Sequence, residues 1–224
     1  MRPIIRPGRV TMSAIAAVSL LSAAALANAD APLKAANAPA EADPHAHHHM
    51  NMNSGARRSE AQYTAPEVAL VRDDGKTVSL PGELDDGRPV IMNFIYTSCT
   101  TICPLTSQVF EQVQKRLGSA RDSVHLVSIS IDPEQDTPAR LRVYARQFDA
   151  ARGWDHYTGT VAASIAVQRA FGAYRGDKMS HTPLTLLRAS PGKPWVRFDG
   201  FASADDLLAE RSLWTAEPAA LVAR

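Results

Sequence analysis

Cysteine is scarce in this sequence, since Cys99 and Cys103 are the two cysteines among 224 residues. They stand four positions apart, and a disulfide between them would close a very small loop. The chain-entropy gain from such a loop is only about 2 kcal/mol, which is little for a chain of this size. A purely structural disulfide is therefore a poor explanation for the pair, and a redox couple or a pair of metal ligands remains open.

An excess of charge of one sign is also missing. The chain has 24 basic and 23 acidic residues, and three of the arginines lie within the first nine positions. Without that N-terminal segment the net charge is slightly negative. A balance of this kind argues against nucleic acid or an anionic membrane surface as a partner.

Long apolar runs are absent as well. The run at residues 10–26 has 17 residues, diluted by serines and alanines, whereas a membrane span needs roughly 20 strongly apolar ones. Arg2, Arg6 and Arg9 precede the run, and Ala27 and Ala29 supply the small residues of a cleavage motif. This layout predicts a secretory signal peptide over residues 1–29 and a periplasmic protein, with an uncleaved membrane anchor as the alternative.

Residues 30–62 have almost no large aliphatic side chains, so they cannot bury enough surface to offset the entropy of ordering. We expect a flexible tether there. Its stretch HAHHHMNMN suits copper in either oxidation state. The candidate ligands of this auxiliary tract are His45, His47, His48, His49, Met50 and Met52.

Residues 63–224 show regular apolar patterning and no internal repeat, which predicts one domain. The segments 89–96 and 124–131 are apolar on both faces and indicate buried central strands. A helical pattern follows each of them, started by Pro104 in one case and by Thr137 with Pro138 in the other.

A third helix is expected over residues 161–171. The turn at 188–193 predicts a β-hairpin, and Ser203 is expected to begin a last helix. This order indicates an α/β fold of the thioredoxin-like type, with a central mixed sheet flanked by helices and a C-terminal hairpin and helix.

In such a fold the cysteines occupy the loop between a central strand and the start of its helix. Unpaired backbone N–H groups at a helix start favour the thiolate form. Dithiol oxidoreductases of this fold generally use the spacing C-x-x-C, whereas C-x-x-x-C leaves the two sulfurs open enough to hold a metal ion. Two thiolates with an added imidazole favour copper or zinc.

Three histidines of the domain could supply that imidazole. His125 begins a predicted central strand and His156 lies in the connection after the second helix, so we expect ordinary packed or surface histidines there. His181 ends a polar run just before the hairpin. In a thioredoxin-like sheet that loop lies against the cysteine turn, which makes His181 the expected third ligand. Met179 lies close to it but is left out of the predicted site.

Residues 63–214 resemble the SCO/SenC copper chaperones that serve cytochrome c oxidase assembly. The likeness rests on NFIYTSCTTICP around the cysteines, SISIDPEQDTP after the second strand, and the histidine of MSHTPLTLL. It implies that Cys99, Cys103 and His181 bind one copper ion, with Asp136 supporting the site. It also implies a carrier, without enzymatic turnover, that passes copper to another exported protein, most plausibly the dinuclear copper centre of the oxidase.

Two departures from the family pattern keep a second hypothesis open. Ser180 stands where the family usually has aspartate, and Pro183 stands where thioredoxin relatives often place a proline beside their active cysteines. The alternative is a thiol:disulfide reductase in which Cys99 and Cys103 form a redox-active disulfide. Such a protein would keep the cysteines of a copper-receiving partner reduced.

Overall fold

The computed structural model describes residues 55–215. The predicted signal peptide at 1–29 and the histidine and methionine tract lie outside the described residues. Within the described range, no helix is long and apolar enough to cross a membrane.

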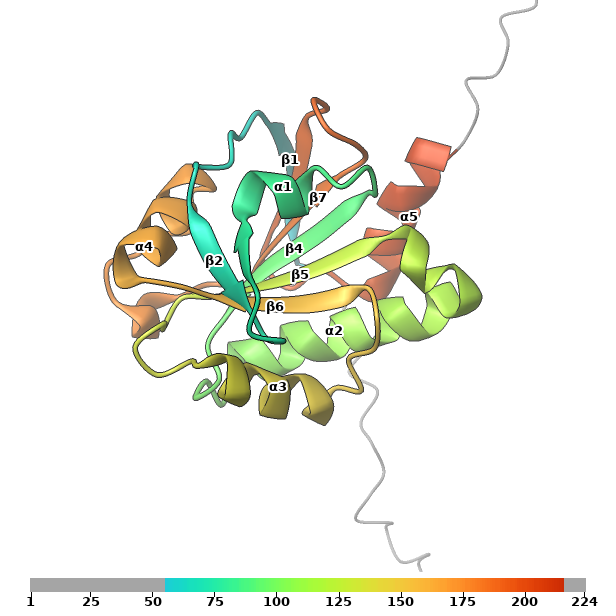
Figure 1. The fold of residues 1–224 in the computed structure, drawn as a ribbon. Coiled ribbons are helices and arrows are strands. Elements are labelled where there is room, and N and C mark those ends of the chain that lie inside the picture. The colour runs from blue at the N-terminus through green and yellow to red at the C-terminus, as the bar shows by residue number, and fades with distance from the viewer. Residues whose placement is uncertain (1–54, 216–224) are drawn as a thin grey trace, which may run out of the picture. The chain divides into compact units, whose positions relative to one another are not determined.

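Strands and helices alternate along most of the chain (Figure 1). In chain order the elements are β1 (Arg57–Ala61), β2 (Ala69–Arg72), β3 (Thr77–Ser79), α1 (Leu80–Leu84), β4 (Val90–Ile95), α2 (Ile102–Leu117), the short 3-10 helix η1 (Gly118–Ser123), β5 (His125–Ser130), α3 (Pro138–Gln147), β6 (Trp154–Thr158), α4 (Val161–Ala170), the 3-10 turn η2 (Lys178–Ser180), β7 (Leu184–Arg188), β8 (Trp195–Asp199) and α5 (Ala204–Thr215).

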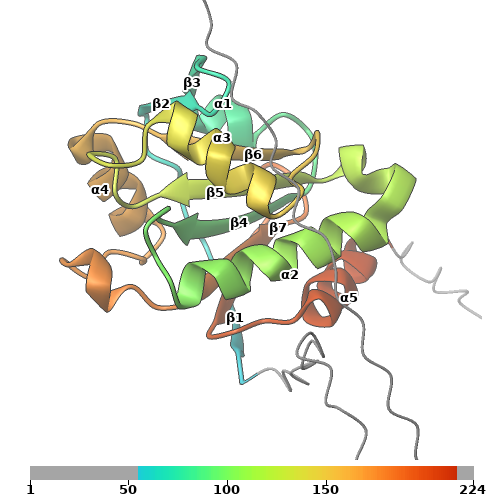
Figure 2. The ribbon, with the colours of Figure 1, turned by 90° about the horizontal axis from the view of Figure 1, so that it is seen from below.

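All the strands join one mixed sheet in the order β1-β8-β7-β4-β5-β6-β2-β3. The central strands β4, β5 and β6 are parallel, and β7 pairs with β4 in the antiparallel direction. Helices α2, α3 and α5 bury one face of the sheet, and α1 and α4 bury the other (Figures 1 and 2). The predicted thioredoxin-like α/β class is confirmed.

Local start signals in the sequence explain where the helices begin. Pro104 lies in the first turn of α2, where its missing N–H removes no helical hydrogen bond. Thr137 Oγ1 accepts the N–H of Arg140 at 3.3 Å and so caps α3. Ser203 and Asp206 exchange side-chain and backbone hydrogen bonds before α5. The predicted starts of these three helices are confirmed.

His156 is a packed histidine, as expected, but its predicted place in a connection was wrong. This residue lies in β6, an inner strand of the sheet, and its ring stacks on Trp154 with 5.2 Å between centroids. Residues 154–158 include an aspartate and a histidine among the aromatic residues, which hides the apolar pattern of a buried strand. His125 does begin a central strand and is buried as expected.

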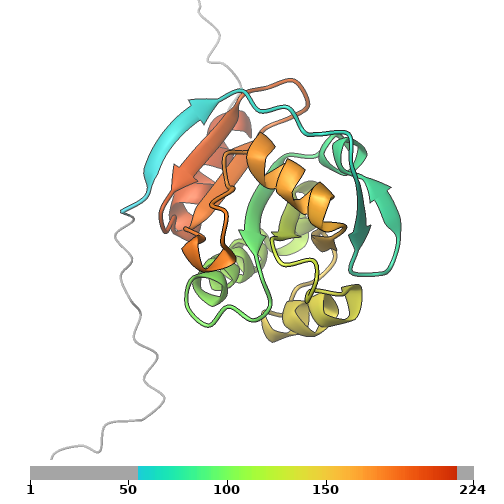
Figure 3. The same ribbon diagram turned by 90° about the vertical axis from the view of Figure 1, so that its left-hand side faces the viewer.

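The sheet also begins earlier than the sequence indicates. Residues 57–61, which we expected in the tether, form the edge strand β1 and pair with β8 beside the hairpin (Figure 3). Their side chains are mostly exposed or half-buried. An edge strand is held by backbone hydrogen bonds and needs no apolar face of its own, so composition gave no sign of it.

Candidate metal centre

The two cysteines lie where β4 ends and α2 begins. Cys99 is 7% exposed and Cys103 is fully buried, and no disulfide joins them. The N–H of Cys103 donates to the sulfur of Cys99 at 3.3 Å. Thr101, at the N-cap position, makes no side-chain capping bond. The sulfur of Cys99 therefore satisfies a free N–H group of the helix start, a place that favours negative charge.

The environment separates the acidities of the two thiols. Partial burial raises the pKa of the Cys99 thiol, but hydrogen bonds from the backbone N–H groups of Cys103 and Thr101 outweigh it and bring the pKa to about 7. Burial raises the pKa of the Cys103 thiol far above its usual range. Near neutral pH the pair thus combines a readily ionised thiol, Cys99, with a fully buried thiol that stays protonated, Cys103.

Asp136 is buried directly beneath the cysteine loop. One carboxylate oxygen accepts the hydroxyl of Thr97 and the other accepts the hydroxyl of Ser130, both at 2.6 Å. The backbone N–H of Thr97 also points at the carboxylate, at 3.2 Å. Because Thr97 follows β4 and Ser130 ends β5, this carboxylate fixes the cysteine loop to the neighbouring strand. The part played by Thr97 and Ser130 was not predicted from the sequence.

His181 lies against the strand that leads to the cysteines, as the sequence predicted. It is 7% exposed, and its Nε2–H donates to the carbonyl of Phe94 in β4 at 3.1 Å. Burial lowers the pKa of the His181 imidazole, which keeps the ring neutral at pH 7. In this tautomer Nδ1 carries the free lone pair, and a backbone carbonyl on the opposite nitrogen is the usual support of a metal-binding histidine.

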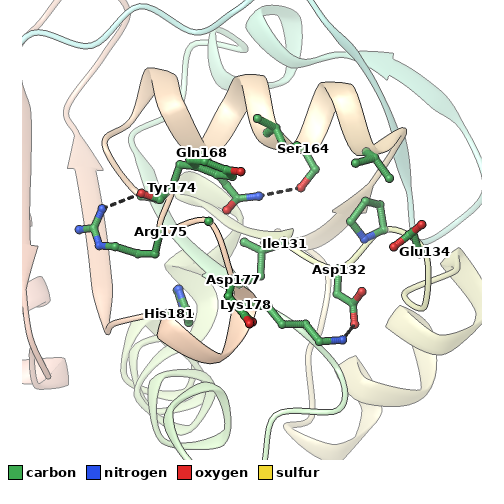
Figure 4. Close-up of a pocket in the computed structure, with 15 residues that line it drawn as sticks. Ile131, Asp132, Glu134, Ser164, Gln168, Tyr174, Arg175, Asp177, Lys178 and His181 are labelled. Carbon is green, nitrogen blue, oxygen red and sulfur yellow. Dashed lines mark hydrogen bonds and ion pairs between the residues drawn. The ribbon is translucent and has the colours of Figure 1, made fainter.

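The loop that carries His181 is held over the cysteine loop by two further contacts. The Lys178 ammonium pairs with Asp132, in the loop after β5, at 2.5 Å, and the hydroxyl of Tyr96 donates to the sulfur of Met179 at 3.7 Å. Figure 4 shows His181 and the Lys178–Asp132 pair on the wall of a small pocket of about 140 Å³. Tyr96, Asp132 and Lys178 are site residues that the sequence analysis missed.

The three predicted ligands are close in the fold but not yet arranged around one point. Metal bonds of about 2.3 Å to sulfur and 2.1 Å to nitrogen, as for zinc, require ligand atoms within roughly 4.6 Å of one another. Among the described residues, the set of three His, Cys, Asp or Glu side chains that meets such a spacing is Glu83, His125 and Asp155. A change in the position of the His181 side chain or of its loop is therefore needed for Cys99, Cys103 and His181 to share one ion.

The donor set itself fits copper. Two sulfur ligands are soft and suit Cu(I), and an imidazole with a free nitrogen adds a ligand that Cu(II) accepts. Asp136 adds a negative charge behind the sulfurs without contacting them in any hydrogen bond of the structure.

Comparison with known proteins identifies the family of this chain. The sequence profile of the family SCO1/SenC matches residues 56–214. The chain belongs to the SCO1/SenC family. A SCO1 protein homolog of Bacillus subtilis is 35% identical over 104 residues, which are 46% of this chain and 53% of that protein. The matches span about half the length of the first two curated relatives.

Solved structures of SCO1/SenC proteins cover most of the described chain. BsSco is described as a cytochrome c oxidase assembly protein with a disulfide switch. Its structure superposes on this one with a TM-score of 0.59 at 28% identity, and the aligned part covers 71% of this chain and 98% of BsSco. ScoI of Bradyrhizobium japonicum was solved with copper bound. Its TM-score is 0.57 at 26% identity, and the aligned part covers 67% of this chain and 98% of ScoI. The predicted family is confirmed, and copper occurs in solved members.

Proposed function

We propose that this SCO1/SenC protein is a periplasmic copper carrier that binds one copper ion through Cys99, Cys103 and His181. The observation that carries the proposal is the arrangement at the start of α2: an acidic thiol, a buried thiol one turn on, and a neutral imidazole held against the same strand. The copper-bound relative supports the choice of metal.

Copper is the cargo of this function. Cu(I) replaces the protons of the two thiols, and the released protons go to solvent on the side of Cys99, the less deeply buried of the pair. Movement of the His181 loop adds the imidazole, which a Cu(II) ion needs more than a Cu(I) ion does. A partner's cysteines and histidines can then exchange for these ligands one by one, without release of free copper.

We propose the dinuclear copper centre of cytochrome c oxidase as the receiving site. Support comes from the relative described as a cytochrome c oxidase assembly protein. We also propose three parts of the chain. Residues 1–29 are a signal peptide, and the tether after them gathers copper through its His and Met tract. The copper-binding domain follows, and it includes β1, which pairs with β8.

A second function, thiol:disulfide reductase, is favoured by the unequal thiols. The Cys99 thiolate would attack a partner's disulfide, release one partner thiolate and form a mixed disulfide. The Cys103 thiol, after losing its proton, would displace the second partner thiolate, so the pair ends as a disulfide and the partner gains two electrons. The pKa of about 7 for Cys99 suits the attacking role.

His181→Ala separates the two functions. The carrier needs the imidazole for stable Cu(II), whereas dithiol exchange needs only an ionised attacking thiol, which the helix start supplies. We expect the variant to lose Cu(II)–thiolate absorption and oxidase copper loading in cells at low copper, and to keep a reversible Cys99–Cys103 couple. Restored oxidase assembly by the variant at low copper would refute the carrier function and leave the reductase in its place.

A further inference from the structure

A second cluster of possible metal ligands lies at the opposite end of the central strands from the cysteines. It joins Glu83 of α1, His125 at the start of β5 and Asp155 of β6, whose ligand atoms all lie within 4.8 Å of one another. His125 pairs with Val90, the first residue of β4, whereas the cysteine loop follows the last. The length of the six-residue strand, roughly 17–20 Å, therefore separates the two places.

The His125 ring is oriented as a metal ligand would be. Nδ1 lies 3.1 Å from the carbonyl oxygen of Glu83 and donates its hydrogen there. Nε2 faces a carboxylate oxygen of Asp155 at 3.0 Å and the hydroxyl oxygen of Tyr157 at 3.2 Å. Since the carbonyl accepts the Nδ1–H, Nε2 can offer its lone pair to a metal ion that the Asp155 carboxylate also binds.

The third ligand is already directed at the same point. The hydroxyl of Tyr157 donates to Oε2 of Glu83 at 2.6 Å, so the Glu83 carboxylate lies beside the same phenol that contacts His125. His125 is 1% exposed, while the side chains of Glu83 and Asp155 are 20% and 27% exposed. The histidine is thus fixed inside the protein, and the two carboxylates leave a route for an ion from solvent.

The charges around the cluster leave an excess of negative charge. Arg72 pairs with Asp74 at 2.7 Å and contacts Glu83 at 3.4 Å. Arg88 forms an ion pair with Asp86, and the Asp86 carboxylate also lies 3.5 Å from Nδ1 of His125. Burial and the charges of Asp155 and Asp74 raise the pKa of the neighbouring Asp73 carboxyl. Next to the ring, the carboxylates of Glu83, Asp86 and Asp155 thus outnumber the guanidinium groups of Arg72 and Arg88, and a bound cation would offset this excess of negative charge.

We propose that Glu83, His125 and Asp155 form a second metal site, which takes a divalent ion of the zinc type. One imidazole and two carboxylates are nitrogen and oxygen ligands suited to Zn²⁺, with water completing the shell. The ion would lie between Nε2 of His125 and the carboxylate of Asp155. The site contains no sulfur, so it discriminates against Cu(I) and stays independent of the cysteines.

The test uses the full chain with two changes that remove the other metal ligands: Cys99→Ser with Cys103→Ser, and deletion of residues 45–52. Zn²⁺ binding is measured by calorimetry, and Co²⁺ binding is measured by visible absorption. We expect one ion per chain, and a shift of the unfolding midpoint to higher temperature with Zn²⁺. Asp155→Asn and His125→Gln should each weaken binding at least tenfold.

Asp86→Asn is the matched control for Asp155→Asn. Both variants remove one carboxylate charge beside His125, but Asp86 lies next to Nδ1, whereas the proposed ion binds at Nε2. We expect it to change the Zn²⁺ affinity by only a few fold. Glu83→Gln, which keeps the hydrogen bond from Tyr157, replaces His125→Gln if that variant does not fold. Absence of Zn²⁺ binding in the parent at millimolar concentration, or equal binding by Asp155→Asn, would show that the cluster is only an ion-pair network and overturn the proposal.

Discussion

The unequal cysteines carry the chemistry at the scale of single residues. The helix start lowers the pKa of Cys99 to about 7 while burial raises the pKa of Cys103. The alkylation rate of Cys99 by iodoacetamide should therefore rise with pH, reach half its maximum near pH 7 and then level off. Cys103 should react far more slowly at every pH. We expect Cys99→Ser to remove the fast phase, and a midpoint near pH 8.5 or above would contradict the assigned acidity.

Asp136 should support the site without binding the metal. Its carboxylate accepts hydrogen bonds from Thr97 and Ser130, and an amide in its place would direct hydrogens at those hydroxyls. We expect Asp136→Asn to cost about 1–3 kcal/mol in the free energy of unfolding and to weaken copper binding roughly 10–100-fold. Ser130→Ala is the control, because it removes one hydrogen bond and keeps the charge. Equal copper affinity of the two variants would speak against a role for the charge of Asp136.

At the scale of elements, the loop between α4 and β7 carries His181 and is joined to the loop after β5 by the Lys178–Asp132 pair. Because the Lys178 ammonium is exposed to solvent, this pair adds little to stability. Because His181 must move to reach the sulfurs, Lys178→Met should speed copper uptake in stopped-flow measurements with little change in the unfolding midpoint. Lys193→Met, in the hairpin turn, is the matched control. Uptake rates that do not differ between the two variants would exclude the pair as a restraint.

The edge strand β1 gives a second element-scale prediction. Five residues of β1 pair with β8, and Arg58 binds the buried Glu210 through two hydrogen bonds. A chain that starts at Tyr63 should therefore lose about 2–4 kcal/mol of unfolding free energy relative to one that starts at Gly55, at about 1 kcal/mol for each backbone hydrogen bond. Urea denaturation measures the difference. Equal midpoints would mean that β1 contributes nothing to the domain.

The sequence predicted the elements that have a strong internal pattern. Strands β4 and β5 are continuous apolar runs, and α3 has a threonine cap with a proline beside it. It missed β1 and β6, since edge pairing and burial of a histidine leave no apolar pattern. It also missed β2, β3 and α1, which have only three to five residues each and are too short to show a periodic pattern. The neighbourhood of Cys99 and Cys103 with His181 followed from the fold class, but the hydrogen bonds of Thr97, Ser130 and Lys178 depend on distances that only the folded chain sets.

The whole molecule should lose stability on mild acidification. Burial lowers the pKa of His156 from 6.5 to about 4, so the unfolded chain takes up a proton below pH 6.5 while the folded chain does not until about pH 4. Stability therefore falls as the pH drops through this window, by up to about 3 kcal/mol for this residue. The lowered pKa of His181 acts in the same direction.

Unfolding by urea between pH 7 and 4 tests this account with His156→Phe, which keeps a ring to stack on Trp154. We expect a clearly flatter pH dependence for the variant, and a smaller change for His181→Ala. An unchanged slope in His156→Phe would mean that other groups dominate the acid response.

The copper content of the purified chain tests the central claim most directly. The chain with residues 45–52 deleted, so that the predicted tract cannot contribute, is loaded with copper, desalted and analysed for metal. We predict one copper per chain in this parent and almost none in the same chain with Cys99→Ser or Cys103→Ser. Unchanged copper content in Cys99→Ser would contradict the proposed carrier function.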